Sequence, residues 1–203
     1  MGDIWNIKEQ YKRQMGSLWI RSNSKGNRGM FGGGYAPSYN NTVQYLTLST
    51  LGNAADFGDL TVSRSARAVS SFTRFVCGGG NSPPGLKNEI DYFTIASTGN
   101  GADFGDLSGT RAAMGGKGNN TRGVFSGGIT PSNSNIMEYI SIAHMGNTVD
   151  FGDLTVARMV PAGANSPTRG VAAGSSAPTD TIDYIQFATL GDATDFGDLT
   201  SSR

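Results

Sequence analysis

The residues best placed for chemistry belong to a short motif, Asp-Phe-Gly-Asp-Leu, which the 203-residue chain contains four times. Each copy carries two aspartates and an arginine five residues after the second: Asp56, Asp59 and Arg64; Asp103, Asp106 and Arg111; Asp150, Asp153 and Arg158; Asp195, Asp198 and Arg203. Such aspartates, with Asn53 before the first pair, resemble Ca²⁺ ligands, although the distal glutamate of an EF-hand loop is missing. A metal or catalytic motif is needed once, whereas a structural motif is needed in every repeated unit. The count favours a structural role, and we expect neither a metal nor a cofactor.

As a structural element, the motif is expected to form a tight turn at the corner of a repeated unit. Aspartate and glycine both favour turns, and Phe57 would fill the space between two units. The second aspartate, Asp59 in the first copy, would accept backbone N–H groups or pair with Arg64 in a charge-assisted hydrogen bond. The other three copies are expected to behave alike.

The remaining residues offer little for catalysis. His144 is the only histidine and stands in a turn with no counterpart in the other copies, whereas a nucleophilic triad needs a histidine beside its nucleophile. The single cysteine, Cys77, is expected to fill core space. A glycosidase needs two carboxylates at a set separation, but acids that recur once per repeat are more simply ion-pair partners of the repeat arginines: Asp91, Glu138 and Asp183. We therefore expect no catalytic residues and no enzymatic activity.

Three landmarks recur in register along the chain. The first motif aspartates and a set of tyrosines both advance in steps of 47, 47 and 45 residues: Tyr45, Tyr92, Tyr139 and Tyr184. A set of arginines advances in steps of 46, 48 and 47: Arg28, Arg74, Arg122 and Arg169. Whole units have therefore been duplicated, and we place them at approximately 21–63, 64–110, 111–157 and 158–203.

Each unit reads as a set of short strands. A glycine-ended apolar stretch is followed by a proline-containing loop, a tyrosine strand with apolar residues on both pleat faces, and the motif. The chain holds 30 glycines but only 16% charged residues, a composition typical of all-β proteins with many turns. Its zero net charge and the lack of a basic stripe argue against nucleic acid as a ligand.

Strands in units of 45–48 residues, stacked sheet on sheet, predict a four-bladed β-propeller. The chain ends suggest how its ring would close. The N-terminal stretch SLWIRSNSKG has Arg21 without a preceding motif, and the C-terminal DFGDLTSSR has the reverse lack, so the two ends would complete one blade by exchanging a strand. The alternative is an open arc or array that neighbouring subunits complete.

The first twenty residues differ from the repeats. Their apolar residues recur at spacings of three and four, which predicts a short amphipathic helix, and two tryptophans add the aromatic area that interfaces use. We expect this helix to dock onto another protein through Ile4, Trp5, Ile7, Tyr11, Met15, Leu18 and Trp19. The alternative is that it packs on the side of the propeller itself. Residues 1–28 also hold six basic against two acidic residues. No signal peptide and no membrane-spanning stretch are expected.

Recognition is expected in the loops after the glycines, because they differ between copies while the framework repeats. Their tyrosines, amides and one lysine could stack on and hydrogen-bond to a sugar or a protein surface: Tyr35, Tyr39, Asn40, Asn41, Lys87, Asn88 and Asn133. Tolerance of sequence drift is the competing interpretation of these loops.

The glycine-ended strand followed by a tyrosine strand resembles the kelch and galactose-oxidase family over residues 21–203, although the Asp-Phe-Gly-Asp-Leu motif is not part of the usual kelch consensus. Galactose oxidase's copper ligands have no matching motif here. The tandem RGVF…DFGDL units and the opening GDIWNIKEQY also resemble structural proteins of tailed bacteriophages, especially phages of aquatic bacteria. That resemblance implies a virion component assembled in the host cytoplasm, in a tail, baseplate, fibre or capsid decoration. It would be present in several copies and contact other virion proteins and a host glycan or protein. The alternative is a cellular kelch-like protein- or carbohydrate-binding module.

Overall fold

The computed structural model describes residues 27–159, 161–175 and 179–202. In these residues the chain forms seventeen strands and no helix, arranged as four antiparallel sheets and one two-stranded hairpin. No described segment is a helix that could cross a membrane. The helix expected within residues 1–20, and with it the seven predicted docking residues, lies outside the described residues.

Four sheets follow one another in chain order. The first contains β1 (Arg28–Tyr35), β2 (Tyr39–Thr47) and β3 (Ala55–Asp59), and the second contains β4 (Ser65–Ser70), β5 (Arg74–Ser82), β6 (Gly85–Thr94) and β7 (Ala102–Asp106). The third contains β8 (Gly115–Gly118), β9 (Arg122–Ser126), β12 (Ile136–Ser141) and β13 (Val149–Asp153), with the hairpin β10 (Ile129–Thr130) and β11 (Ser132–Asn133) between β9 and β12. The fourth contains β14 (Ala162–Asn165), β15 (Arg169–Ala173), β16 (Thr181–Gln186) and β17 (Thr194–Asp198).

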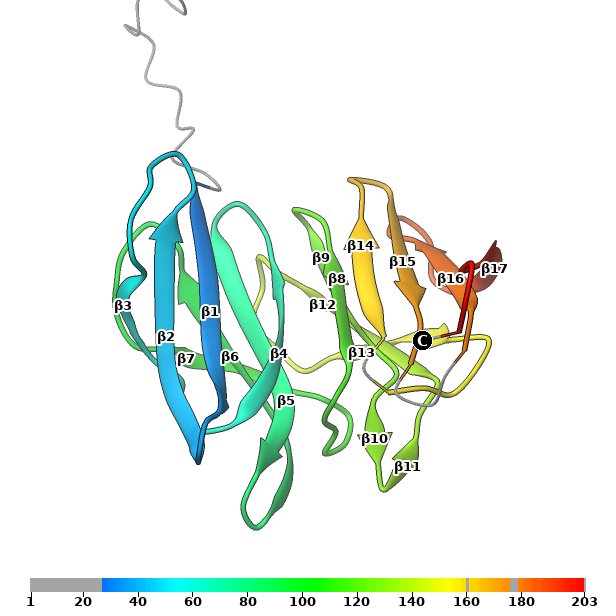
Figure 1. Ribbon diagram of the computed structural model, residues 1–203, viewed down its shortest axis with the longest axis horizontal. Coiled ribbons are helices and arrows are strands. Elements are labelled where there is room, and N and C mark those ends of the chain that lie inside the picture. Colours follow the sequence, from blue (N-terminus) through cyan, green and yellow to red (C-terminus); the bar gives the residue numbers. More distant parts are fainter. Residues whose placement is uncertain (1–26, 160, 176–178, 203) are drawn as a thin grey trace, which may run out of the picture.

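The sheets lie side by side from the first to the fourth (Figure 1). Their neighbouring strands make the contacts: β1 touches β4, β4 touches β8, and β8 touches β14. Each sheet follows the chain in a simple antiparallel order, so successive strands are always neighbours. The expected all-β class and a propeller-like arrangement of four sheets are therefore confirmed.

The Asp-Phe-Gly-Asp motif forms a strand, and the prediction of a tight turn is wrong. Its four copies are β3, β7, β13 and β17, and each pairs with the tyrosine strand of its own sheet through a register shift. The shift leaves the motif phenylalanine, Phe104 in β7, without a partner, and the following glycine, Gly105, has φ = +141°. A Cβ there would lie 2.5 Å from the Gly146 carbonyl of the next sheet, so this position also needs glycine to let two backbones approach.

The tyrosine strand is an inner strand of every sheet, as its two-sided apolar pattern predicts. Val43, Ile90 and Met137, each two residues before the tyrosine, are completely buried. In the second and third sheets, residues on the opposite pleat face, such as Phe93 and Ile140, are buried as well. Neighbouring sheets cover both faces of these strands, which explains why polar and apolar residues do not alternate along them.

The hydrophobic core consists of three clusters, one between each pair of consecutive sheets. Phe57 and Val43 of the first sheet pack against Phe93 and Cys77 of the second, and matching clusters join the second sheet to the third and the third to the fourth. The expectation that Phe57 fills the space between units is confirmed. So is the core position of Cys77, whose burial raises the pKa of its thiol to about 12.

The predicted strand exchange between the chain ends is wrong in the form proposed. Residues 162–198 alone supply all four strands of the fourth sheet, so its completion needs no strand from the N-terminus. Among the described residues it is the first sheet that has three strands. Arg21 and Arg203, the residues on which the exchange was based, lie outside the described part of the chain.

Candidate functional site: the repeated junctions and the hairpin tips

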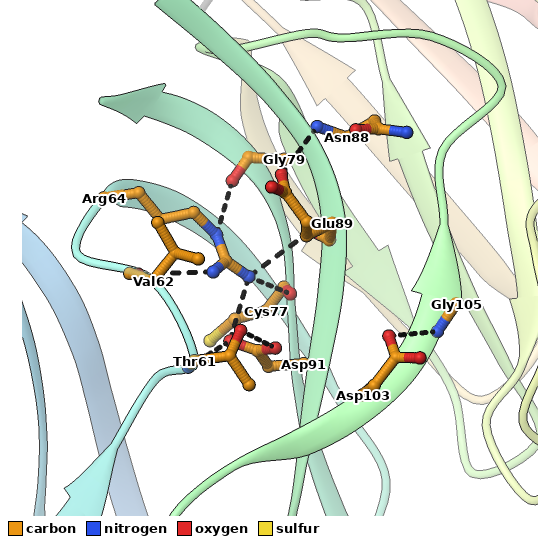
Figure 2. A network of polar contacts seen from close by, with 10 residues as sticks. All are labelled: Thr61, Val62, Arg64, Cys77, Gly79, Asn88, Glu89, Asp91, Asp103 and Gly105. Atoms are coloured by element: carbon orange, nitrogen blue, oxygen red, sulfur yellow. Dashed lines mark hydrogen bonds and ion pairs between the residues drawn. The ribbon is translucent and has the colours of Figure 1, made fainter. Parts of the chain in front are cut away.

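A buried arginine occupies the centre of each junction, the contact between two consecutive sheets. In the first junction it is Arg64, from the link between β3 and β4, whose side chain is fully buried. Its guanidinium donates to the Gly79 carbonyl at 3.0 Å and pairs with the Asp91 carboxylate of β6 at 3.1 Å (Figure 2). Arg111 with Glu138 and Arg158 with Asp183 repeat this pair in the other two junctions.

The structure corrects the partner predicted for these arginines within the motif. Arg64 pairs with Asp91 of the second sheet, whereas Asp59 lies in strand β3 of the first sheet and its own N–H donates to the Asn100 side chain. The physical reason is burial: the arginine side chain enters the junction, where only a carboxylate on the middle strand can compensate its charge. The role predicted for Asp91, Glu138 and Asp183 as ion-pair partners is confirmed.

Each junction carboxylate also receives hydrogen bonds from the residue two positions after the motif's second aspartate. The N–H and hydroxyl of Thr61 donate to Asp91 at 3.0 and 2.7 Å. Thr155 donates to Asp183 in the same way, and the N–H of Ser108 donates to Glu138. The sequence analysis missed these residues, although a hydroxyl at this position in every copy was an available signal.

Burial in the junction changes the pKa of one of the arginines. Desolvation lowers the pKa of Arg111 from its ordinary value, and the nearby Glu138 carboxylate opposes that change. Removing either partner would leave a buried charge without compensation, which costs more than the intact pair contributes. The carboxylates considered above for a glycosidase, Asp91, Glu138 and Asp183, therefore form ion pairs that join neighbouring sheets.

A stacked layer of three side chains, the landmark arginine, the repeat tyrosine and the motif phenylalanine, recurs in every sheet. In the second sheet the Arg74 guanidinium lies 4.8 Å from the centre of the Tyr92 ring, and Tyr92 meets Phe104 edge to face at 6.0 Å. Arg74 then donates to the Ile142 carbonyl of the third sheet at 2.8 Å. Arg28 and Arg122 do the same toward their next sheets, so the landmark arginines are cross-junction donors.

Backbone hydrogen bonds from the next repeat cover the edge of the first three motif strands, β3, β7 and β13. The N–H groups of Gly99 and Gly101 donate to the carbonyls of Phe57 and Asp59 at 2.7 and 2.8 Å. The same two bonds recur in the second and third junctions. The turn of one repeat therefore covers the strand edge of the preceding repeat, which would otherwise be open to pairing with another chain.

The third junction contains a buried lysine, Lys117 of β8. Its ammonium donates to the Ser126 hydroxyl at 2.7 Å, and its side chain is 2% exposed. Desolvation, with a smaller contribution from the nearby Arg158, lowers the pKa of Lys117 to about 7. The corresponding residue in the second sheet is the buried Val69, so the lysine distinguishes one junction from the others.

The predicted binding residues lie at three hairpin tips along one edge of the molecule, the lower edge in Figure 1. All seven belong to strands rather than loops, since the strands of each hairpin continue to short turns: Tyr35 in β1; Tyr39, Asn40 and Asn41 in β2; Lys87 and Asn88 in β6; Asn133 in β11. The expectation that all of them are loop residues is therefore wrong. Tyr35 is 66% exposed and meets Tyr39 edge to face at 5.0 Å, and Asn133 is also exposed.

Four of these residues also support the junctions through their backbones. The carbonyls of Asn40 and Lys87 accept the N–H groups of Arg64 and Arg111, and those of Asn41 and Asn88 accept the N–H groups of Leu60 and Leu107. Their side chains are half-buried. Tyr35 and Asn133 thus offer the more accessible side chains of the set.

The opposite edge carries a hollow of about 520 Å³ that the sequence analysis did not anticipate. Polar turns from several sheets line it, together with the half-exposed Phe72. In each turn one side chain accepts two backbone N–H groups: Ser71, Asn119 and Ser166. A hydroxyl or amide three residues before Arg74, Arg122 and Arg169 was the signal in the sequence.

Among the described residues, no three histidine, cysteine, aspartate or glutamate side chains gather as a potential metal group. His144 is exposed in the turn between β12 and β13 and lies 3.3 Å from the Ser141 hydroxyl. No protein-family model matches the chain, and no curated protein matches it in sequence.

Proposed function

We propose that this protein is a non-enzymatic structural component of a bacteriophage virion that presents its hairpin tips for assembly contacts or host attachment. Its repeats would form a kelch-like propeller scaffold. The observation that carries the structural role is that the same junction occurs three times. In each of the three junctions, a repeat arginine and a repeat carboxylate are buried as an ion pair between sheets. The virion setting rests on the resemblance of the repeats to phage structural proteins.

The contrast between the repeated junctions and the differing hairpin tips supports a function in which the tips are presented to partners. The junctions repeat the same contacts, whereas the tips differ in length and composition, from the Tyr35–Tyr39 hairpin to the small β10–β11 hairpin. A repeated scaffold with differing tips is a common way to carry recognition. The tips contact other virion proteins or the host surface in this proposal.

Mass spectrometry of purified particles, together with immunogold labelling, tests the virion assignment. We expect the protein in washed particles at a defined stoichiometry, with label at one site. Its absence from particles purified from the producing host would overturn the assignment.

A second function, recognition of carbohydrate by a cellular protein, is favoured by one observation. Tyr35 is largely exposed and lies in ring contact with Tyr39, so the hairpin tip presents an aromatic face of the kind that stacks on a sugar ring. Glycan-array binding that is lost in Tyr35→Ala, with the protein absent from phage particles, would favour this function over the first.

A further inference from the structure

The two end sheets present the two halves of a junction that is made three times inside the molecule. We call the surface that a sheet turns to the next sheet its trailing face, and the surface turned to the preceding sheet its leading face. The trailing faces of the first three sheets are covered, and so are the leading faces of the last three. The trailing face of the fourth sheet and the leading face of the first are the ones to compare with them.

The trailing face of the fourth sheet is exposed at the residue that anchors the other junctions. Phe57, Phe104 and Phe151 are each 2% exposed, whereas Phe196 is 57% exposed. A Cβ on the motif glycines Gly58, Gly105 or Gly152 would strike the next sheet, whereas at Gly197 it would meet nothing within 4 Å. This face is therefore uncovered along its motif strand.

The exposed trailing face nevertheless has the same internal arrangement as the covered ones. Arg169 lies 5.2 Å from the centre of the Tyr184 ring, and Tyr184 meets Phe196 edge to face at 5.9 Å. In the covered junctions this layer aims the arginine at a carbonyl of the next sheet. The fourth copy is thus preformed, with its arginine exposed.

The leading face of the first sheet is exposed at the matching positions. Ile95, Ile142 and Phe187, whose carbonyls accept the landmark arginines, are at most 6% exposed, whereas Leu48 in the same register is 63% exposed. Phe31 is 61% exposed, whereas its counterparts Cys77, Phe125 and Ala172 are buried. A large apolar surface stays open on this side as well.

At one position the leading face of the first sheet differs from the others in a way that suits exposure to solvent. Where the second, third and fourth sheets place the junction carboxylates, the first sheet has Gln44, which is exposed. An exposed amide needs no compensating charge, whereas a carboxylate in a junction requires its arginine. A contact made through this face therefore lacks the buried ion pair of the internal junctions.

We propose that the trailing face of one copy of this chain docks on the leading face of a second copy, head to tail, in the register of the internal junctions. Phe196 enters the place beside Leu48 and Phe31, and Arg169 donates to the Leu48 carbonyl. The partner is a second copy because the three internal junctions already show that this surface pair fits. Such a heterologous contact extends an assembly of copies into a ring or a filament. The inference concerns copies of this chain alone and does not depend on the virion assignment.

Sedimentation velocity of the full chain over a range of concentrations provides the first test. We expect concentration-dependent species larger than one chain. Leu48→Asp and Phe196→Asp should each raise the dissociation constant about tenfold or more, because each puts a charge into an apolar anchor position. Leu51→Asp is the matched control, since Leu51 is fully exposed and its counterparts Met145 and Leu190 stay exposed beside covered junctions. It should associate like the unaltered chain.

Mixing the two variants gives the sharper test. L48D retains its trailing face and F196D retains its leading face, so the mixture should form a one-to-one dimer and nothing larger, whereas each variant alone stays monomeric. If an aspartate variant does not give the circular dichroism spectrum of the unaltered protein, L48S and F196S replace the pair. A chain that is monomeric at every concentration, variants that associate normally, or a mixture that stays monomeric would each overturn the proposal. The first of these results would indicate closure within one chain or cover by its N-terminal segment.

Discussion

The internal junctions and the end faces are built from the same repeat positions in different surroundings. Phe104 and Phe196 occupy the same place in the motif and each meets the tyrosine of its own sheet edge to face, yet Phe104 is buried against the next sheet and Phe196 is exposed. The difference teaches that the repeat specifies a surface rather than a contact. Burial, and the stability that comes with it, depends on whether another repeat follows.

The largest contrast is expected at the junction ion pair. Asp91→Ala leaves the fully buried Arg64 without a carboxylate, so we expect a loss of about 3–5 kcal/mol in the free energy of unfolding, measured by urea denaturation. Gln44→Ala removes the residue at the same position of the first sheet, where the side chain is exposed, and should change stability by less than about 0.5 kcal/mol. Equal effects of the two substitutions would contradict the assigned role of Asp91.

The motif phenylalanines provide a second matched pair. Phe104→Ala opens a cavity in the core between the second and third sheets, for which we expect a loss of about 3–5 kcal/mol. Phe196→Ala should lower the free energy of unfolding by about 1 kcal/mol or less in dilute solution, because the Phe196 side chain is already largely exposed and buries little apolar area. Thermal unfolding of both variants at the same low concentration decides the point. A large loss for Phe196→Ala would mean that its face is covered in the single chain.

Lys117 should make the stability of the third junction, unlike that of the second, depend on pH. Its folded pKa of about 7 lies below its ordinary value of 10.5, so above pH 7 the unfolded chain binds a proton that the folded chain does not. The free energy of unfolding should therefore rise with pH between 7 and 9, by at most about 1.4 kcal/mol per unit. Above pH 9 the raised pKa of Cys77 acts in the opposite direction.

Denaturation of the Lys117→Met variant across the same pH range isolates this contribution. Methionine keeps most of the side-chain volume and does not titrate, so the rise between pH 7 and 9 should disappear. Retention of the full slope in the variant would show that other groups cause it.

The smallest contrast is expected between the landmark arginines. Arg74→Ala removes the stack on Tyr92 and the bond to the Ile142 carbonyl, at a cost of about 1–2 kcal/mol. Arg169→Ala removes the stack alone and should cost about 0.5 kcal/mol. Urea denaturation in parallel resolves the difference, and a larger loss for Arg169→Ala would speak against a cross-junction role for Arg74.

Much of the fold was readable from repeats and patterns. The steps between tyrosines and between arginines located four copies of one unit, and apolar residues on both sides of each tyrosine indicated a strand covered on two faces. Repeats make such inference reliable, because each position is sampled four times and chance matches average out. The ion-pair role of Asp91, Glu138 and Asp183 followed from the same argument.

Other features of the fold could not be predicted from short segments of the sequence. The Asp-Phe-Gly-Asp motif has the composition of a turn, and it forms a strand because the tyrosine strand of its own sheet supplies hydrogen bonds to one edge in all four copies. The turn of the next repeat adds hydrogen bonds to the other edge in the first three copies. Asp59 is the nearer acid to Arg64 in sequence, but Asp91, 27 residues away, is the one that shares its buried site. Sequence distance carries no information about which sheet faces which.

The sequence by itself determined the all-β class, the four repeats and the residues that each repeat devotes to its neighbours, since these depend on periodicity and residue type. Tertiary structure decided which copies are buried and which are exposed, where Arg64 finds its partner, and that Lys117 loses its ordinary pKa. The physical reason is that burial and desolvation arise from sheets packed together, so identical motifs acquire different properties according to their place in the array.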